Sequence, residues 1–577
     1  MDTGVNNAFF LILRRMRAPI IALIVIYAIA ILGLTLIPGV DAEGKTTAPL
    51  SFFHAFYFIS YTATTIGFGE IPNAFSDAQR MWVTICIYLT VISWSYSILT
   101  LITLFQDKGF QNTLTTNRFR RRIKYLKEPF YLICGCGEAG SLIAHTFDYR
   151  NQAFVVIEID ELRVQELDLQ DFKTDTPALC GDARLPETLK LAGLTHAKCA
   201  GVLAVTNDEE TNLAIAIAVR LLNPKIPVIG RARSPSVAAN MASFGTDHII
   251  NAFDRFADNL ALAIAAPSHF RLLDILTRLP AIPIPKPHLP PTGNWILCGY
   301  GKFGHAVAEH LLPEGIKLTI IDPTASDADT WITGDGTEAA TLIEAGINSA
   351  VGIIAGTDND VNNLSIAVTA NELKPDLYVV ARQNHSANSA LFDAFEADYM
   401  MVPSRIIAQE CIAILTTPLL AHFLSHQRHA DEVWCENIVE RLEKLCDGLT
   451  PSVWNIRINA SEALAGWHAL MHDRPFTLGE IIRDGTDRSQ NLPIEALMVQ
   501  RNGDLFILPK LDFELKAGDN LLLASSRNTR RKLEFSLQNA NELSYLLDGD
   551  TSSGSWLWHK LAAPIKVLRS TPQKRQK

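Results

Sequence analysis

Two long apolar runs lie near the start of the chain, at residues 19–38 and 81–105, and neither contains a charged side chain. A helix rises about 1.5 Å per residue, so either run is long enough to cross a hydrocarbon core of about 30 Å. We therefore predict two membrane-spanning helices. A cleaved signal peptide is the alternative for the first run, but its apolar stretch is longer than such peptides usually carry.

A third apolar stretch, residues 51–63, lies between the two predicted spans and is rich in aromatic side chains. It is too short to cross the membrane and return, which is typical of a re-entrant half-helix buried against protein. Residues 64–70, TTIGFGE, follow it directly. We group residues 1–106 as one membrane domain.

The positive charges predict how this domain is oriented. Only two basic residues lie between the spans, among four acidic ones. Because basic residues favour the cytoplasmic side, we predict both termini in the cytosol and residues 39–80 outside the inner (plasma) membrane. The flanking basic residues are Arg14, Arg15 and Arg17 before the first span, and Lys108, Arg118, Arg120, Arg121, Arg122 and Lys124 after the second.

A different pattern follows a linker at residues 107–128. An apolar strand at 130–134 leads into GCGEAG and a helical pattern, and a second strand ends at Glu158, 23 residues after the first glycine. This is the dinucleotide-binding fingerprint, because the glycines allow a tight turn and close approach of a pyrophosphate, and the acid can bind ribose hydroxyls. The candidate binding residues of this copy are Gly135, Gly137, Glu138, Gly140 and Glu158.

The same pattern occurs a second time, with GYGKFG after a strand at 294–298 and Asp322 at the same spacing. Later pairs of matching residues hold one offset of 151 residues, which indicates an internal duplication. A duplication predicts the fold of both copies but not that both bind a ligand. Lys302 could reach a phosphate or be a solvated surface lysine. The candidates of this copy are Gly299, Gly301, Lys302, Gly304 and Asp322.

These patterns predict a multidomain chain with a helical two-span domain, two α/β Rossmann-like domains and a small α+β C-terminal subdomain. The amphipathic stretch from about Asn251 either crosses onto a neighbouring unit or is an internal core helix. Pro418 and the charges that follow residues 406–424 argue against a third span. After the membrane domain and linker, the predicted parts are a first domain with its crossover helix at 129–278, a Pro-rich linker at 279–292, a second domain at 293–430, the subdomain at 431–545 and a tail at 546–577.

The composition agrees with a small membrane part attached to a large soluble part. The 577-residue chain is 48% hydrophobic and only 19% charged, and its net charge of −10 argues against a nucleic-acid partner. Nine cysteines form no CxxC pair. We therefore expect a reducing cytosol, with neither a disulfide framework nor a zinc knuckle.

The stretch TATTIGFGE, residues 62–70, resembles the selectivity filter of potassium channels, which usually reads TVGYG. In that filter, backbone carbonyls replace the water around a potassium ion, and glycines allow the alternating backbone angles that this requires. The resemblance implies four chains around one axis, within lipid, with K⁺ as the permeant ion and no other metal. The implied filter residues are Thr64, Thr65, Ile66, Gly67, Phe68 and Gly69.

Two departures from the family pattern affect the pore. Phe68 lacks the hydroxyl of the commoner tyrosine, so one hydrogen bond behind the filter is missing. The second span contains no glycine at which to bend. An opening bend must use another feature, such as the serines at positions 93, 95 and 97.

The two α/β units resemble RCK domains (KTN or TrkA-N type), and residues 515–523 resemble the TrkA-C subdomain. The motifs GDA at 181–183, TNDEETNL at 206–213 and RA at 231–232 carry the likeness. The strand-end acids would repel a 2′-phosphate, which favours NAD or adenine nucleotides over NADP. No acid directly follows the RA dipeptide, so the calcium site of some archaeal relatives is not supported. The resemblance places Asp182 and Ala183 at the base and Arg231 near the phosphates, with Asp335, Gly336 and Arg382 as counterparts.

The whole pattern resembles a prokaryotic two-transmembrane potassium channel with tandem RCK domains. It implies a potassium-selective tetramer that is opened or closed by an NAD- or ADP-type ligand, with no enzymatic activity and no catalytic residue. One alternative is a membrane-anchored NAD-dependent oxidoreductase, although no motif supplies its proton donor. The other is a non-conducting regulatory subunit of a potassium transporter. Neither alternative explains residues 64–69.

Overall fold

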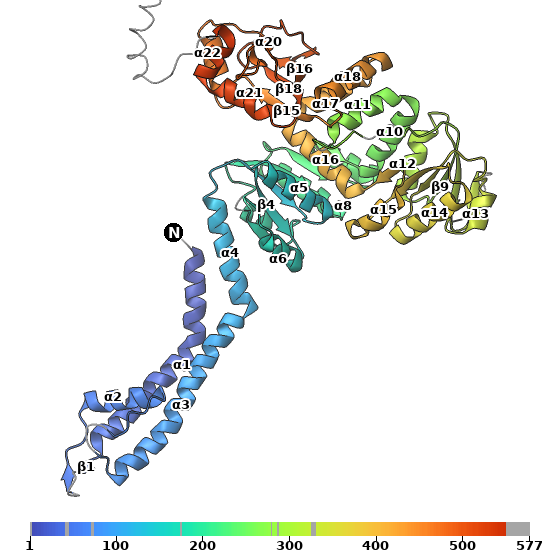
Figure 1. The fold of residues 1–577 in the computed structure, drawn as a ribbon. Helices are drawn as coiled ribbons and strands as arrows, with labels where there is room; N and C mark the ends of the chain where they lie inside the picture. The colour runs from blue at the N-terminus through green and yellow to red at the C-terminus, as the bar shows by residue number, and fades with distance from the viewer. Residues whose placement is uncertain are drawn as a thin grey trace, which may run out of the picture. The chain divides into compact units, whose positions relative to one another are not determined.

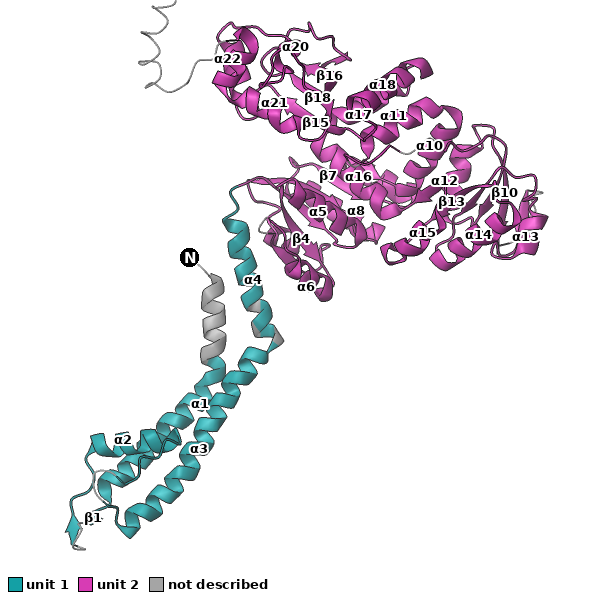
Figure 2. Cartoon of the chain, in the orientation of Figure 1, with its two compact units in different colours: residues 1–127 teal, residues 128–577 magenta. Residues whose placement is uncertain are grey.

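The structure, a computed structural model, describes residues 3–40, 45–70, 74–173, 176–278, 280–284, 288–324 and 330–549 (Figure 1). The chain divides into two compact units, residues 1–127 and 128–577, which are described separately (Figure 2). Residues 550–577 of the predicted tail, and residues 279 and 285–287 of the predicted Pro-rich linker, lie outside the described residues.

The first unit holds two helices that are long and apolar enough to cross a membrane, as the sequence predicts. Helix α1 (Thr3–Leu36) begins well before the predicted span, so Pro19 lies inside the helix. Helices α1 and α3 (Asp77–Gln106) pack side by side, and α2 (Phe52–Ala63) packs on both. The residues after α3 form a basic helix, α4 (Lys108–Lys124), and a short ribbon pairs β1 (Gly39–Val40) with β2 (Thr46–Thr47).

A small apolar core holds α2 against the two long helices. Leu34 of α1, Phe58 and Ile59 of α2 and Val83 of α3 are buried together. Ser51 caps the start of α2 by accepting a hydrogen bond from the backbone N–H of His54. Since burial of apolar area is the main stabilising contribution, these contacts fix the direction in which α2 delivers the loop after it.

The second unit contains two parallel six-stranded sheets that repeat one doubly wound order, which confirms the predicted Rossmann-like fold of both copies. The first sheet has the order β5-β4-β3-β6-β7-β8 and the second β11-β10-β9-β12-β13-β14. The strands are β3 (Phe130–Cys134), β4 (Ala153–Glu158), β5 (Ala178–Cys180), β6 (Cys199–Ala204), β7 (Val228–Arg231) and β8 (His248–Ile250), then β9 (Asn294–Cys298), β10 (Lys317–Asp322), β11 (Trp331–Thr333), β12 (Gly352–Ala355), β13 (Tyr378–Arg382) and β14 (Tyr399–Met401).

Helices cover the sheets, and both copies place one directly after the glycine loop. The first copy has α5 (Glu138–Tyr149), α6 (Glu161–Leu169), α7 (Pro186–Leu191), α8 (Glu209–Leu222) and α9 (Pro235–Ser243). The second has α12 (Lys302–Leu311), α13 (Ala339–Glu344), α14 (Asp360–Leu373), a 3₁₀ turn at Ser386–Asn388 and α15 (Ser389–Phe395).

Two broken helix pairs exchange between the copies, which answers the question that the sequence left open about residues after Asn251. Helix α10 (Ala252–Ala265) packs on α12 of the second copy, and α16 (Pro403–Thr416) packs on α5 of the first. Each continues, after a break before a proline, as α11 (Pro267–Thr277) or α17 (Pro418–Gln427). The chain bends by 108° between α16 and α17, which have the length and composition of a span only when taken together.

The C-terminal part is an antiparallel sheet with helices around it, as predicted for a small α+β subdomain. Its order is β15-β18-β16-β17. Buried Asp519 of the LxxGDxLLL stretch forms an ion pair with Arg501 at 2.8 Å and accepts the backbone N–H of Lys516. The elements are α18 (Glu432–Leu445), β15 (Ser452–Arg457), α19 (Leu464–Met471), α20 (Leu478–Ile481), β16 (Ile494–Arg501), β17 (Asp504–Ile507), β18 (Asn520–Ser525), α21 (Thr529–Gln538) and α22 (Ala540–Asp548).

Candidate pore loop and glycine-loop sites

The loop after α2 alternates between two regions of backbone conformation. Thr65, Gly67 and Gly69 have φ of 62°, 64° and 89°, whereas the residues between them do not take positive values. A Cβ at Gly67 or Gly69 would meet nothing within 4 Å of the described residues, so the backbone angle and not crowding calls for glycine there. The sequence predicts this alternation at both glycines but not at Thr65.

Hydrogen bonds to Tyr61, on the last turn of α2, hold this loop. The carbonyl of Tyr61 accepts the backbone N–H of Ile66 at 2.9 Å, and its hydroxyl donates to the Gly69 carbonyl at 2.5 Å. The ring of Tyr61 is buried and packs edge-on against Phe68. A hydroxyl therefore does lie behind the loop, although it comes from the helix and not from position 68. The sequence did not predict it, because only the folded-back loop brings the two together.

Glu70 fastens the outer end of the loop to α3. Its carboxylate accepts hydrogen bonds from the Arg80 guanidinium at 2.9 Å and from the backbone N–H of Phe75 at 2.9 Å. These two hydrogen bonds hold the pKa of Glu70 below its ordinary value, and the bond from Arg80 has the larger effect. The loop thus has a hydrogen-bonded anchor at each end.

The candidate bending serines lie in a helix that is unbroken from Asp77 to Gln106. The Ser97 hydroxyl donates to the Ser93 carbonyl at 2.9 Å, one turn back. Such bonds weaken the helical hydrogen bond that shares the carbonyl and often accompany a bend. The role of this stretch as a hinge stays a prediction.

Both glycine loops have the geometry that their spacing predicts. Gly135 and Gly299 have φ of 94° and 91°. A Cβ at Gly140 would lie 2.0 Å from the Gly135 carbonyl oxygen, and one at Gly304 would lie 2.2 Å from that of Gly299. Only glycine allows the helix to start this close to its strand. Gly137 and Gly301 directly precede the first residue of α5 and α12. The backbone N–H groups of the first helical turn, which have no partner within the helix, therefore face the loop.

The acid at the end of the second strand lies beside the loop in each copy. The Glu158 carboxylate accepts the Cys136 N–H at 2.5 Å, and the Asp322 carboxylate accepts the Tyr300 N–H at 2.7 Å. Glu158 is only 5% exposed and also accepts two further backbone N–H groups, whereas Asp322 faces an open cavity. The structure therefore brings the acid and the glycine loop together in both copies, and the second acid lines a cavity.

The strand-end arginines are buried (Arg231) or half-buried (Arg382), and their partners differ. Arg231 donates to the Asn207 side chain at 2.8 Å. Arg382 donates to the Gly356 carbonyl at 3.2 Å and lies over the rings of Phe253 and Phe303. Burial lowers the pKa of each guanidinium to about 10, so both are charged at neutral pH.

The residues of the two GD motifs also differ in their surroundings. In the first copy, two nitrogens of Arg184 hold the Asp182 carboxylate. In the second copy, the Asp335 carboxylate accepts the backbone N–H of Thr337 at 3.0 Å. Ala183 is buried, and a Cβ at Gly336 would lie 2.8 Å from the sulfur of Cys298, which accounts for glycine at that position.

A cavity of about 500 Å³ opens at the glycine loop of the second copy. Arg233, which comes from the first copy, reaches this cavity, and sequence reasoning missed it because spacing does not report contacts between copies. The predicted residues that line the cavity are Gly299, Gly301, Lys302, Asp322, Asp335, Gly336 and Arg382; of the second copy's candidates, only Gly304 does not line it.

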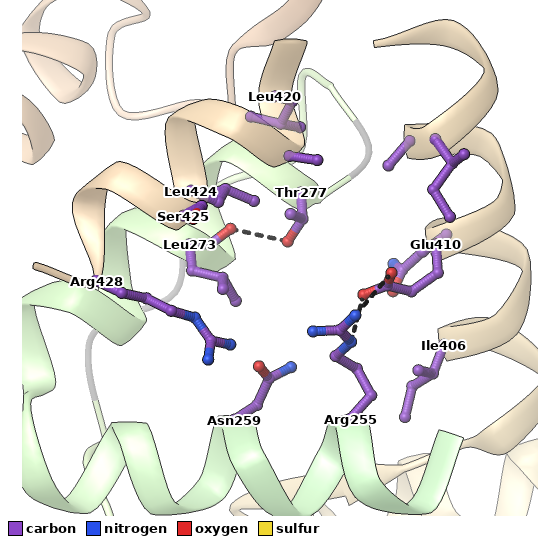
Figure 3. A pocket seen from close by; sticks show the side chains of 14 residues that line it. Arg255, Asn259, Leu273, Thr277, Ile406, Glu410, Leu420, Leu424, Ser425 and Arg428 are labelled. Atoms are coloured by element: carbon purple, nitrogen blue, oxygen red, sulfur yellow. Dashed lines mark hydrogen bonds and ion pairs between the residues drawn. The ribbon is translucent and has the colours of Figure 1, made fainter. Parts of the chain in front are cut away.

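A second cavity of about 390 Å³ lies between the exchanged helix pairs (Figure 3). Its walls are mainly apolar, and Arg255 forms an ion pair with Glu410 at 2.9 Å on one side. The Asn259 side-chain oxygen is buried and has no hydrogen-bond partner among the described residues. No predicted residue lines this cavity.

Comparison with known proteins matches the membrane segment and the two α/β units separately. Residues 20–107 match the family described as "Ion channel", and residues 131–252 and 295–403 each match the TrkA-N domain. "Potassium channel protein 1" of Methanocaldococcus jannaschii is 30% identical over 202 residues, which are 34% of this chain and 58% of the relative. "Probable potassium channel protein 2" of the same organism is 28% identical over 227 residues, 39% of this chain and 64% of that relative.

The chain thus spans less than two thirds of either relative's length. A solved structure, "GsuK channel bound to NAD", is 17% identical with a TM-score of 0.43, and the match covers 92% of this chain and 99% of that one. The chain therefore joins an ion-channel segment to two TrkA-N domains, and it is homologous to archaeal potassium channel proteins.

Proposed function

We propose that this chain is the subunit of a homotetrameric, potassium-selective channel whose conductance depends on an NAD- or ADP-type ligand at its TrkA-N units. The observation that carries the proposal is the alternation of positive φ at Thr65, Gly67 and Gly69, in a loop that follows a half-helix between two apolar helices. Alternation turns successive carbonyls to one side, where they can replace the water around K⁺.

Four chains are needed because one loop supplies only one side of each ion cage. Many apolar side chains of α1, α2 and α3 are exposed in the single chain, including Ile24, Phe52 and Ile92. Lipid and three further copies would cover these surfaces. We place the termini and the TrkA-N units in the cytosol because the basic residues flank the two spans.

The regulatory ligand follows from the glycine loops and their acids. A loop that admits no Cβ at its third glycine brings helix N–H groups close to a phosphate, and Asp322 suits a ribose with free hydroxyls. Such a ligand changes conduction only by the difference between its affinities for the two forms of the channel.

The two alternative functions explain less of the structure. An oxidoreductase would use the glycine loops but would leave the hydrogen-bonded pore loop without a purpose. A non-conducting subunit fits the TrkA-N units but leaves the same loop unexplained. Two of the matched relatives are described as a potassium channel protein and a probable potassium channel protein, which also favours a channel over an enzyme.

Potassium flux into liposomes tests the proposal. Wild-type protein should carry potassium in preference to sodium, and Gly67→Asp should abolish the flux because its side chain strains the loop and alters the pore's charge. Gly448→Asp is the matched control, since Gly448 also has a positive φ (74°) and open space around it, but lies in the C-terminal subdomain. Equal flux from all three proteins would disprove the pore assignment.

A further inference from the structure

We propose that only the second glycine loop binds the phosphates of the nucleotide, and that these phosphates compete with Glu209 of the first copy for Lys302. The inference rests on the proposed nucleotide-binding function. It specifies which copy binds the ligand and which contact between the copies reports the binding.

The first residue of the helix after each loop has opposite charge in the two copies. A helix N-terminus attracts anions, and Lys302 adds a positive charge there, whereas Glu138 adds a negative one that repels phosphate. The Glu138 carboxylate already accepts two hydrogen bonds from Ser386 of the second copy, at 2.8 Å from its N–H and 3.0 Å from its hydroxyl. Contacts with the second copy thus hold a negative charge at the start of α5.

Arg233 and its counterpart in the second copy also differ in charge. Arg233 of the first copy lines the cavity of the second, and its Nε is buried without a partner among the described residues. The matching position in the second copy is Asn384, which is neutral and bonds to Asp360 at 2.9 Å. The second loop therefore faces two cations, Lys302 and Arg233. At the equivalent positions the chain has Glu138 and Asn384, and the cation beside the first loop is Arg163, next to its middle glycine.

The two copies also differ in the free space around the middle glycine of the loop. A Cβ at Gly301 would meet no described atom within 4 Å, whereas one at Gly137 would lie 3.5 Å from the Arg163 guanidinium and 3.8 Å from the Asn207 amide. This glycine is the one that a pyrophosphate approaches most closely. Room for it is left at the second loop.

Lys302 also joins the two copies. Its ammonium lies 2.7 Å from one carboxylate oxygen of Glu209. The other oxygen of Glu209 accepts the N–H groups of Arg233 and Ser234 at 2.8 and 2.9 Å. The Glu209 carboxylate therefore connects Lys302 to the segment that carries Arg233. A phosphate that draws Lys302 away would release this tie between α8 and α12.

Binding of ADP and NAD to the full chain in detergent, measured by calorimetry, tests the inference. We expect one nucleotide per chain. Lys302→Ala and Arg233→Ala should each weaken binding about tenfold to a hundredfold, the usual effect of losing a charged hydrogen bond. The matched changes, Glu138→Ala at the equivalent of Lys302 and Asn384→Ala at the equivalent of Arg233, should leave the Kd within about twofold. Glu209→Gln should tighten binding by about threefold or more, because the lysine loses its competing partner.

Two nucleotides per chain, or loss of binding in Glu138→Ala but not in Lys302→Ala, would overturn the assignment to the second copy. Weaker binding in Glu209→Gln would overturn the competition. Size-exclusion profiles and melting temperatures identify any variant that fails to fold. Lys302→Arg keeps the positive charge and should bind the nucleotide more tightly than Lys302→Ala. Because the assay does not use ion flux, this inference can fail while the channel conducts, and it can hold while conduction ignores the nucleotide.

Discussion

The Tyr61 hydroxyl is a side-chain group that holds the pore loop by a direct hydrogen bond. Its bond to the Gly69 carbonyl supplies a hydroxyl where Phe68 has none. Sequence comparison with the filter motif reveals the missing hydroxyl but cannot reveal its replacement, because the donor lies eight residues away on another element. A motif shows which residues a site contains. Whether another residue replaces a missing group depends on the folded structure.

Tyr61→Phe should make the loop less able to keep its conducting form. Loss of one buried hydrogen bond costs about 1 kcal/mol, which is a shift of about fivefold in the balance between conducting and collapsed forms. Lower steady potassium flux in liposomes would report it. Tyr57→Phe, on the more exposed face of α2, is the control, and Phe68→Tyr in the Tyr61→Phe background should recover part of the flux. Unchanged flux in Tyr61→Phe would exclude the role.

Glu209 gives a prediction about pH. Burial alone would raise its pKa, but the Lys302 ammonium, the Arg233 N–H and the Ser234 hydroxyl lower it to about 2. A lowered pKa means that the folded protein gains stability from the ionised group above the unfolded value near 4.5, and loses it as the pH falls toward 2. The melting temperature of wild type should therefore exceed that of Glu209→Gln by a constant margin from pH 8 to about 5, and the margin should shrink below about 4.5. A margin that changes near neutral pH would contradict this account.

At the scale of elements, amphipathic periodicity predicts the exchanged helices but not their partners. The pattern of residues 252–265 fits either a crossover or an internal helix, because both bury one apolar face. The structure resolves this through Phe253 and Phe256, which pack against Phe303 of the other copy. Similarly, residues 107–128 lack an apolar pattern, and within this predicted linker residues 108–124 form the basic helix α4.

Phe303→Ala tests the importance of this packing. The ring is 1% exposed and lies beneath the Arg382 guanidinium, so its removal should cost about 3–5 kcal/mol and lower the melting temperature of the full chain. The change should also weaken ADP binding, since Arg382 loses its support. Phe535→Ala, at a 57% exposed position, should change the melting temperature little. A small effect of Phe303→Ala would mean that the two copies do not depend on this contact.

At the scale of the whole molecule, the sequence predicts two spans, a duplicated Rossmann-like fold and both glycine loops. Repeats and spacing carry this information, because each copy must satisfy the same backbone geometry. The contacts that distinguish the copies are not visible along the chain. Glu138 and Lys302 occupy equivalent positions, but their opposite roles appear only once Ser386 and Glu209 of the other copy lie beside them.

The reversal potential of purified channels in a planar bilayer, with potassium on one side and sodium on the other, tests the central claim most directly. We predict a reversal potential close to the potassium equilibrium value and a conductance that changes when ADP is added on the side of the TrkA-N units. A reversal potential near zero, or no conductance from protein that is a folded tetramer, would contradict the proposal that this chain forms a potassium-selective pore.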